Sequence, residues 1–182
     1  MIDKKRIEES KSNFSIYLKD GLLKKEFNDI SMNAYAKNSD LSLKLADKLI
    51  NDKDLRPYLW VVVTSYYSMF YIANAVILKL GYKTSYKIVH KVTSDALIVL
   101  VLDKLKKELL EEYEQIRDDA LEIASARAEE IIKNYENELD KRSRFQYNMS
   151  EEAKENKART SLNRAKEFVF EMKKILENKN EQ

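Results

Sequence analysis

The chain contains one histidine, His90, and this residue is the first candidate for chemistry. Cleavage of RNA without a metal needs a proton acceptor for the 2'-hydroxyl and a cation for the charge that develops on phosphorus. An unperturbed imidazole titrates near neutral pH, so His90 can serve as the acceptor. Lys87, Arg142 or Arg144 can supply the cation. The alternative interpretation is that His90 is a partly exposed helix residue paired with a neighbour.

A second candidate is the basic corner at residues 141–147, which interrupts two long helical patterns. It combines cations with aromatic rings, a pairing suited to phosphate contact and base stacking: Lys141, Arg142, Arg144, Phe145 and Tyr147. Residues 108–122 hold seven carboxylates against Arg117 alone. The alternative is therefore that Arg142 and Arg144 pair with this acidic helix, in the same or in a second subunit.

Composition excludes several other kinds of site. The chain has no cysteine, so it has no thiolate nucleophile and no zinc–thiolate centre. One histidine cannot build a Glu-x-x-His di-iron site, and the acidic cluster of Asp118, Asp119 and Glu122 is typical of a solvated helix face. The two glycines, Gly21 and Gly81, form no phosphate-binding loop. We expect no metal, no cofactor and a cytoplasmic protein.

Hydrophobic spacing and capping residues predict an all-α bundle of about five to six long antiparallel helices. The expected helices span residues 3–24, 29–51, 57–81, 84–102, 103–140 and 150–178. In the second helix, apolar residues recur mostly at three- and four-residue steps, which predicts a core-facing stripe: Ile30, Ala34, Leu41, Leu45 and Leu49. Asn28 or Asp29 is expected to cap its start, and Ser150 that of the last helix.

The third predicted helix is apolar on every face, which is typical either of the centre of a bundle or of a membrane span. Thr64, Ser65, Ser68 and Asn74 interrupt its apolar surface, and the amphipathic faces of the other helices need a core to cover. We therefore expect a central buried helix and no membrane. Its aromatic residues are expected to be core and subunit contacts, with Ser65, Ser68 and Asn74 as hydrogen-bond partners for buried tyrosines.

Three segments in this order resemble the HEPN superfamily, in particular its small stand-alone prokaryotic members. They are SYYSMFYIANAVILKLGYKTSYKIVHK, RSRFQY and AKENKARTSLNRAKEFV, and the resemblance covers roughly residues 40–178. It implies a helical bundle that is commonly dimeric. Many relatives are metal-independent RNases, often the toxin half of a module with a nucleotidyltransferase antitoxin.

The resemblance also bears on individual residues. Active relatives carry R-x4-6-H, whereas no arginine lies four to six residues before His90. At the late corner of the family pattern, Arg142 and Tyr147 match, and Gln146 replaces an aspartate. In toxin modules of this kind the motif tyrosine can accept a nucleotidyl group, which makes Tyr147 the candidate acceptor.

Two functions remain open at this point. One is an RNA- or nucleotide-associated protein, the toxin-like half of a module with a nucleotidyltransferase, in which His90, Arg142 and Tyr147 are catalytic and Lys87, Lys141, Arg144 and Phe145 bind. The other is a non-catalytic dimeric scaffold that binds a protein or nucleotide partner. Both describe one helical domain over residues 1–182, with 1–30 as an N-terminal helical extension, and both expect a homodimer.

Overall fold

The computed structural model describes the backbone of residues 2–135 and 150–178, and the side chains of these ranges except 126–135. The described residues form helices and one small sheet, in this order: α1 (Lys4–Lys19), β1 (Leu23–Lys25), α2 (Asp29–Ile50), α3 (Tyr58–Lys79), β2 (Tyr82–Thr84), α4 (Val89–Val101), α5 (Lys107–Tyr135) and α7 (Glu151–Glu177). The predicted all-α fold class is confirmed.

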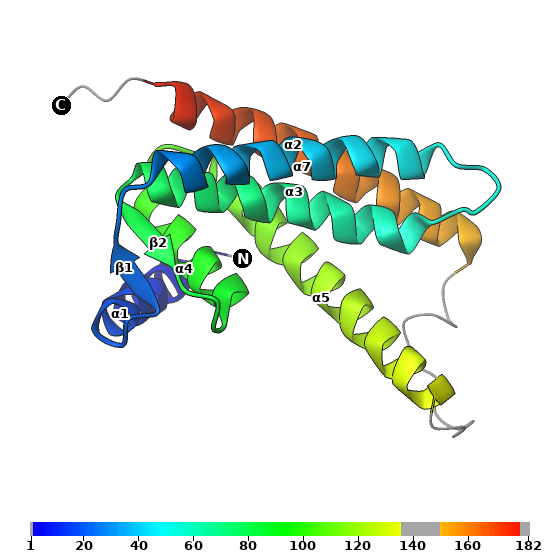
Figure 1. Cartoon of the computed structure of the whole chain (residues 1–182), viewed down its shortest axis with the longest axis horizontal. Helices are drawn as coiled ribbons and strands as arrows, with labels where there is room; N and C mark the ends of the chain where they lie inside the picture. Colours follow the sequence, from blue (N-terminus) through cyan, green and yellow to red (C-terminus); the bar gives the residue numbers. More distant parts are fainter. Residues whose placement is uncertain (1, 136–149, 179–182) are drawn as a thin grey trace.

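The long helices α2, α3 and α7 run side by side, and α5 leaves the bundle at an angle (Figure 1). The short helix α4 and helix α1 lie together at one end. Helix α3 packs against α2, α4, α5 and α7 and is therefore the centre of the fold. It is long and apolar enough to cross a membrane, yet 83% of its most apolar window is buried inside the protein. The prediction of a central buried helix is confirmed.

Local signals place the helix ends where the sequence predicts them in α2, α3 and α7. The Asn28 side chain accepts a hydrogen bond from the backbone N–H of Ser31, and the Ser150 side chain accepts one from Ala153. These bonds satisfy donors that have no partner within the helix. Gly81 follows the end of α3 with φ +87°, a conformation that glycine adopts without strain.

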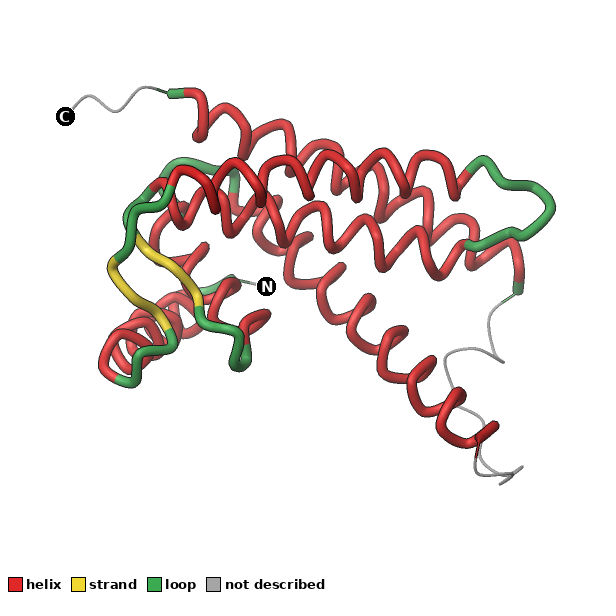
Figure 2. The backbone as a smooth tube through the Cα atoms, in the orientation of Figure 1, coloured by secondary structure: helices red, strands yellow, loops and turns green. Residues whose placement is uncertain are grey.

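The expected first and fourth helices are longer than those observed, because both give residues to a sheet. Strands β1 and β2 pair antiparallel, with Leu23 opposite Thr84 (Figure 2). The backbone N–H of Ser85 also donates to the carbonyl of Leu22 at 2.8 Å. Since residues 82–84 use their backbone groups in this ladder, α4 begins only at Val89. The sheet ties the chain before α2 to the chain after α3.

The predicted core stripe of α2 is wrong at most of its positions, although Leu49 packs partly buried against the core. Ile30 is 84% exposed, Leu41 53% and Leu45 46%. The buried side chains of α2 are instead Ser39, Ala46 and Ile50. The Ser39 hydroxyl donates to the Ser68 carbonyl of α3 at 2.7 Å, so a polar side chain stabilises this contact.

Candidate functional site

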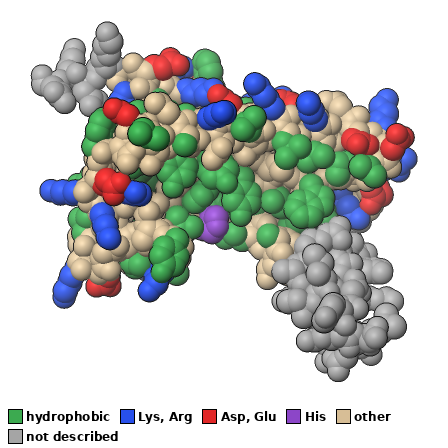
Figure 3. Space-filling view, viewed as in Figure 1, with side chains coloured by type: hydrophobic (Ala, Val, Ile, Leu, Met, Phe, Trp, Pro, Cys, Tyr) green, Lys and Arg blue, Asp and Glu red, His purple; other side chains and the backbone are tan. Residues whose placement is uncertain are grey.

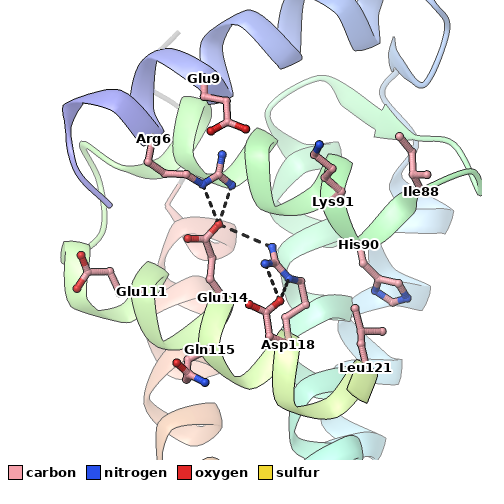
Figure 4. Close-up of a pocket in the computed structure, with 11 residues that line it drawn as sticks. Arg6, Glu9, Ile88, His90, Lys91, Glu111, Glu114, Gln115, Asp118 and Leu121 are labelled. Carbon is pink, nitrogen blue, oxygen red and sulfur yellow. Dashed lines mark hydrogen bonds and ion pairs between the residues drawn. The ribbon is translucent and has the colours of Figure 1, made fainter. Parts of the chain in front are cut away.

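A pocket of about 610 Å³ lies between α1, α5 and the start of α4 (Figure 4). We call it the His90 pocket. Helices far apart in the sequence build its walls. Arg6 and Glu114 lie near its centre and His90 at one side (Figure 4). Its lining residues are Arg6, Glu9, Ile88, His90, Lys91, Glu111, Glu114, Gln115, Arg117, Asp118 and Leu121.

His90 occupies the first turn of α4, and aromatic rings of α3 hold its imidazole. The ring centroid of Phe70 lies 4.7 Å away, that of Tyr66 5.5 Å and that of Tyr67 6.2 Å. The Tyr66 hydroxyl lies 2.6 Å from His90 Nδ1. Because Tyr66 already occupies Nδ1, only Nε2 is available to a ligand or a reacting group.

The surroundings keep both members of this pair neutral. Burial lowers the pKa of His90 below its ordinary value, and the positive charge of Arg117 lowers this pKa further. Burial raises the pKa of the Tyr66 phenol, which therefore keeps its proton. The Tyr66–His90 bond is thus a hydrogen bond between uncharged groups at pH 7.

The arginines of the pocket are already paired with carboxylates. Arg6 lies 2.6 Å from Asp95 and 2.7 Å from Glu114. Arg117 lies 2.8 Å from Asp118 and 3.7 Å from Glu114. Over the whole lining, three cationic side chains face four carboxylates. The pocket therefore has no excess of positive charge with which to attract a phosphodiester.

Ile88 carries backbone strain beside His90. Its φ is +42°, in the left-handed region that a β-branched residue rarely adopts. Its side chain is 57% exposed, so little burial of this side chain compensates for the strain. The conformation turns the chain sharply from β2 into α4 and sets the position of His90. Strain of this kind is often concentrated at functional positions.

The remaining predicted site residues fall in two groups. Lys87 is exposed in the turn before α4 and is not part of the pocket lining, so the helix expected to join Lys87 and His90 starts later. The corner residues lie outside the described residues: Lys141, Arg142, Arg144, Phe145 and Tyr147. In the acidic cluster, Asp118 and Glu122 are exposed, whereas Asp119 pairs with Lys157 at 2.9 Å.

The expected partners of the buried tyrosines are corrected by the structure. Tyr66 bonds His90 of α4, whereas Ser68 donates to the Ser65 carbonyl and Asn74 accepts from Thr84. Asn74 also donates to the Phe70 carbonyl of its own helix, and no hydrogen-bond partner of the buried Ser65 hydroxyl is found among the described residues. A phenol hydroxyl lies farther from its own helix and can reach a group on the adjacent helix.

Sequence reasoning missed the charged residues that share the pocket with His90. Arg6 lies on α1 and bonds Glu114, which is 108 positions away in the chain. Arg117 lies on α5. The available signal was an isolated arginine inside the acidic segment 108–122, since a lone cation among carboxylates commonly has a structural or electrostatic task. Among the described residues, no group of three or more His, Asp or Glu side chains could hold a metal ion.

Comparison with known proteins identifies the fold family. The sequence model described as HEPN domain matches residues 32–176, which is most of the chain. No curated protein and no solved structure matches the chain. Helices α2 to α7 lie almost entirely within the match, whereas α1 and β1 precede it. The resemblance of the sequence to the HEPN superfamily is confirmed.

Proposed function

Because the chain belongs to the HEPN superfamily, whose helical domains are associated with nucleotides and RNA, we propose that it acts by binding, as a non-catalytic dimeric scaffold. In this proposal His90 is a structural partner of Tyr66 and cleaves no RNA. The binding partner is a protein or a nucleotide. The absence of cysteine agrees with a place in the cytoplasm.

One observation carries the proposal: carboxylates hold both arginines near His90. A cleaving site must present a cation to the phosphate as charge develops on it. Here Arg6 is bonded to Asp95 and Glu114, and Arg117 to Asp118. A phosphodiester entering the pocket would have to displace these carboxylates and would meet their negative charge. The arrangement favours a structural role for the charged groups.

An exposed aromatic surface supports the dimeric part of the proposal. We define the aromatic face as Tyr35, Trp60, Tyr67 and Tyr71; Trp60 is 50% exposed, and the others are half-buried. The Tyr35 and Tyr71 rings lie 6.2 Å apart, and those of Tyr67 and Tyr71 5.9 Å apart. Figure 3 shows the single histidine beside a patch of hydrophobic side chains. Tyr and Trp are enriched where protein surfaces meet, so we expect a second copy here.

Light scattering and an RNA-cleavage assay test this proposal together. We expect a dimer at tens of micromolar, within the range of ordinary dimer affinities, and no cleavage of RNA. Tyr67→Lys with Tyr71→Lys should give a folded monomer. Leu41→Lys on the exposed side of α2 is the matched control and should stay dimeric. A monomeric parent, or a dimer lost only in Leu41→Lys, would exclude the aromatic face. Cleavage that His90→Ala abolishes would make His90 the base after all.

The second candidate is an RNA-associated protein, the toxin-like half of a module with a nucleotidyltransferase. Family membership favours it, as does the sequence of the 141–147 corner. In this candidate Lys141, Arg142 and Arg144 contact phosphate, Phe145 stacks on a base, and Tyr147 accepts a nucleotidyl group. The added phosphodiester would place negative charge among the arginines and block them from RNA.

Arg142→Ala with Arg144→Ala tests the second candidate. We expect weaker RNA binding with little change in melting temperature. The dependence of affinity on salt should become shallower by roughly one unit of log-log slope for each phosphate contact removed. A variant with a much lower melting temperature that, while folded, still binds RNA as the parent does would show that both arginines are structural partners of the acidic segment 108–122.

A further inference from the structure

One face of α1 is directed at a single buried carboxylate. Asp95 of α4 is fully buried, and four side chains of α1 donate to it. Arg6 lies 2.6 Å from Oδ1 and Ser10 3.2 Å from the same oxygen. Asn13 lies 3.1 Å from Oδ2 and Tyr17 2.8 Å from it. These donors follow one another at steps of three or four residues, so they form a single stripe along the helix.

The attachment of α1 combines this stripe with apolar packing. Phe14 is buried and Ile7 and Leu18 pack partly buried against the core, whereas Ile16 is 49% exposed. A buried carboxylate is stable only while its donors remain in place, because an unpaired charge in the interior is strongly disfavoured. The docking of α1 and the satisfaction of Asp95 are therefore one event.

Arg6 connects this attachment to the His90 pocket. It also donates to Glu114 Oε1, from Nη2 at 2.7 Å and from Nε at 3.2 Å (Figure 4). Ser94 donates to the same oxygen at 2.8 Å, and Arg117 lies 3.7 Å from it. One carboxylate oxygen is thus shared by a cation of α1 and a cation of α5. Arg6 and Arg117 both line the pocket that contains His90.

We infer that α1 is a releasable latch on the His90 pocket. Hydrogen bonds from its polar stripe to Asp95 hold it in place, and Arg6, Glu114 and Arg117 couple it to the pocket. The latch belongs to this chain's N-terminal segment, which precedes the family match. It operates whether the pocket binds a protein, an RNA or neither, so it does not depend on the proposed function.

The direction of the coupling follows from the groups around His90. These groups are Tyr66 and Tyr67 of α3, Glu114, Arg117 and Asp118 of α5, Arg6 and Glu9 of α1, and Lys91 of α4. When α1 detaches, Glu114 loses its ion pair with Arg6 and can pair more closely with Arg117. The negative charge of Glu114 then offsets the effect of the Arg117 charge on His90. The open pocket also admits water. Both changes favour the protonated imidazole, so the pKa of His90 should rise. By reciprocity, protonation of His90 should loosen α1.

The single histidine makes the latch measurable. The titrating signal of its imidazole Cε1–H proton can be assigned without ambiguity by NMR, and hydrogen exchange reports the opening of α1 separately. Arg6→Met keeps the length of the side chain and removes both of its ion pairs. We expect the amides of α1 to exchange faster by on the order of a hundredfold, because a buried charge has lost its partner. The His90 titration should move to higher pH. Lys5→Met, on the exposed side of α1, is the matched control and should change neither signal.

Two further comparisons keep the inference testable. If Arg6→Met does not fold, Asn13→Ala removes one donor to Asp95 and should give the same two changes at smaller size. In the parent, exchange in α1 corrected for intrinsic rates should be faster at pH 5.5 than at pH 7.5, and His90→Gln should remove this difference. Undocking of α1 with an unchanged His90 titration would overturn the coupling. Unchanged exchange in both α1 variants would overturn the latch itself.

Discussion

Tyr66→Phe removes one oxygen from the centre of the fold and tests the assignment of His90 as a structural partner. Tyr66 is fully buried, and its hydroxyl lies 2.6 Å from His90 Nδ1. The substitution keeps the ring, so the contacts with Phe70 and Tyr113 should persist. What is lost is a hydrogen bond between neutral groups.

The magnitude follows from that bond. A neutral intramolecular hydrogen bond contributes about 0.5–1.5 kcal/mol, and leaving a buried partner unsatisfied costs about 1–3 kcal/mol. Since His90 is only half-buried and water can reach part of its ring, we expect a loss of about 1–2 kcal/mol in the free energy of unfolding. For a chain of this size, that loss lowers the melting temperature by roughly 2–8 °C.

Urea unfolding of the parent, Tyr66→Phe and Tyr82→Phe measures the effect. Tyr82 is the matched control, because it is a half-buried tyrosine outside the aromatic face, its ring packs on Phe14, and its hydroxyl has no hydrogen-bond partner among the described residues. Its substitution should change the free energy of unfolding by less than about 0.5 kcal/mol. Equal losses in the two variants would refute the reasoning, since the Tyr66–His90 bond would then contribute nothing measurable.

Three further predictions concern pH, backbone strain and capping. The pKa of His90 is lower in the folded state than in the unfolded state. Neutral His90 therefore stabilises the fold fully above the unfolded pKa, and this stabilisation is lost as the pH falls. Between pH 7 and pH 5, the parent should lose more free energy of unfolding than His90→Gln in urea titrations. Ile88→Gly relieves a positive φ at an exposed side chain and should raise the free energy of unfolding by about 1 kcal/mol, whereas a decrease would show that the side chain packs. Ser150→Ala removes the side-chain cap of α7 and should cost about 1 kcal/mol by calorimetry, and an unchanged melting temperature would contradict the role of the cap.

Local sequence signals were sufficient for the fold class and for several helix ends. Asn28 and Ser150 cap α2 and α7 because their side chains accept backbone N–H groups three residues ahead, an interaction decided within one turn. The apolar run of α3 identified the central helix, since no other described helix is apolar on all sides. The family resemblance likewise depended on the order of motifs along the chain.

The sequence pattern gave the wrong structure where tertiary packing, and not local preference, determined which side chains are buried and which segments form strands. In α2 the apolar spacing indicated one face, but the buried side chains are Ser39, Ala46 and Ile50. Which face of a helix is buried depends on how its side chains fit against the neighbouring helices, and that fit is not visible in the spacing along one helix. Strands β1 and β2 were missed for a related reason, because each of them is stable only through its pairing with the other.

For the candidate site, the sequence determined which chemistry was available and the tertiary structure determined its arrangement. Composition left one imidazole, His90, as the group that titrates near neutral pH, and excluded thiolate chemistry. The partners of that imidazole come from α3 and α5, and the latch comes from α1. Arg6 reaches Asp95 across 89 positions of the chain. No local spacing encodes such a pair, because the distance between two helices depends on how all the side chains between them pack.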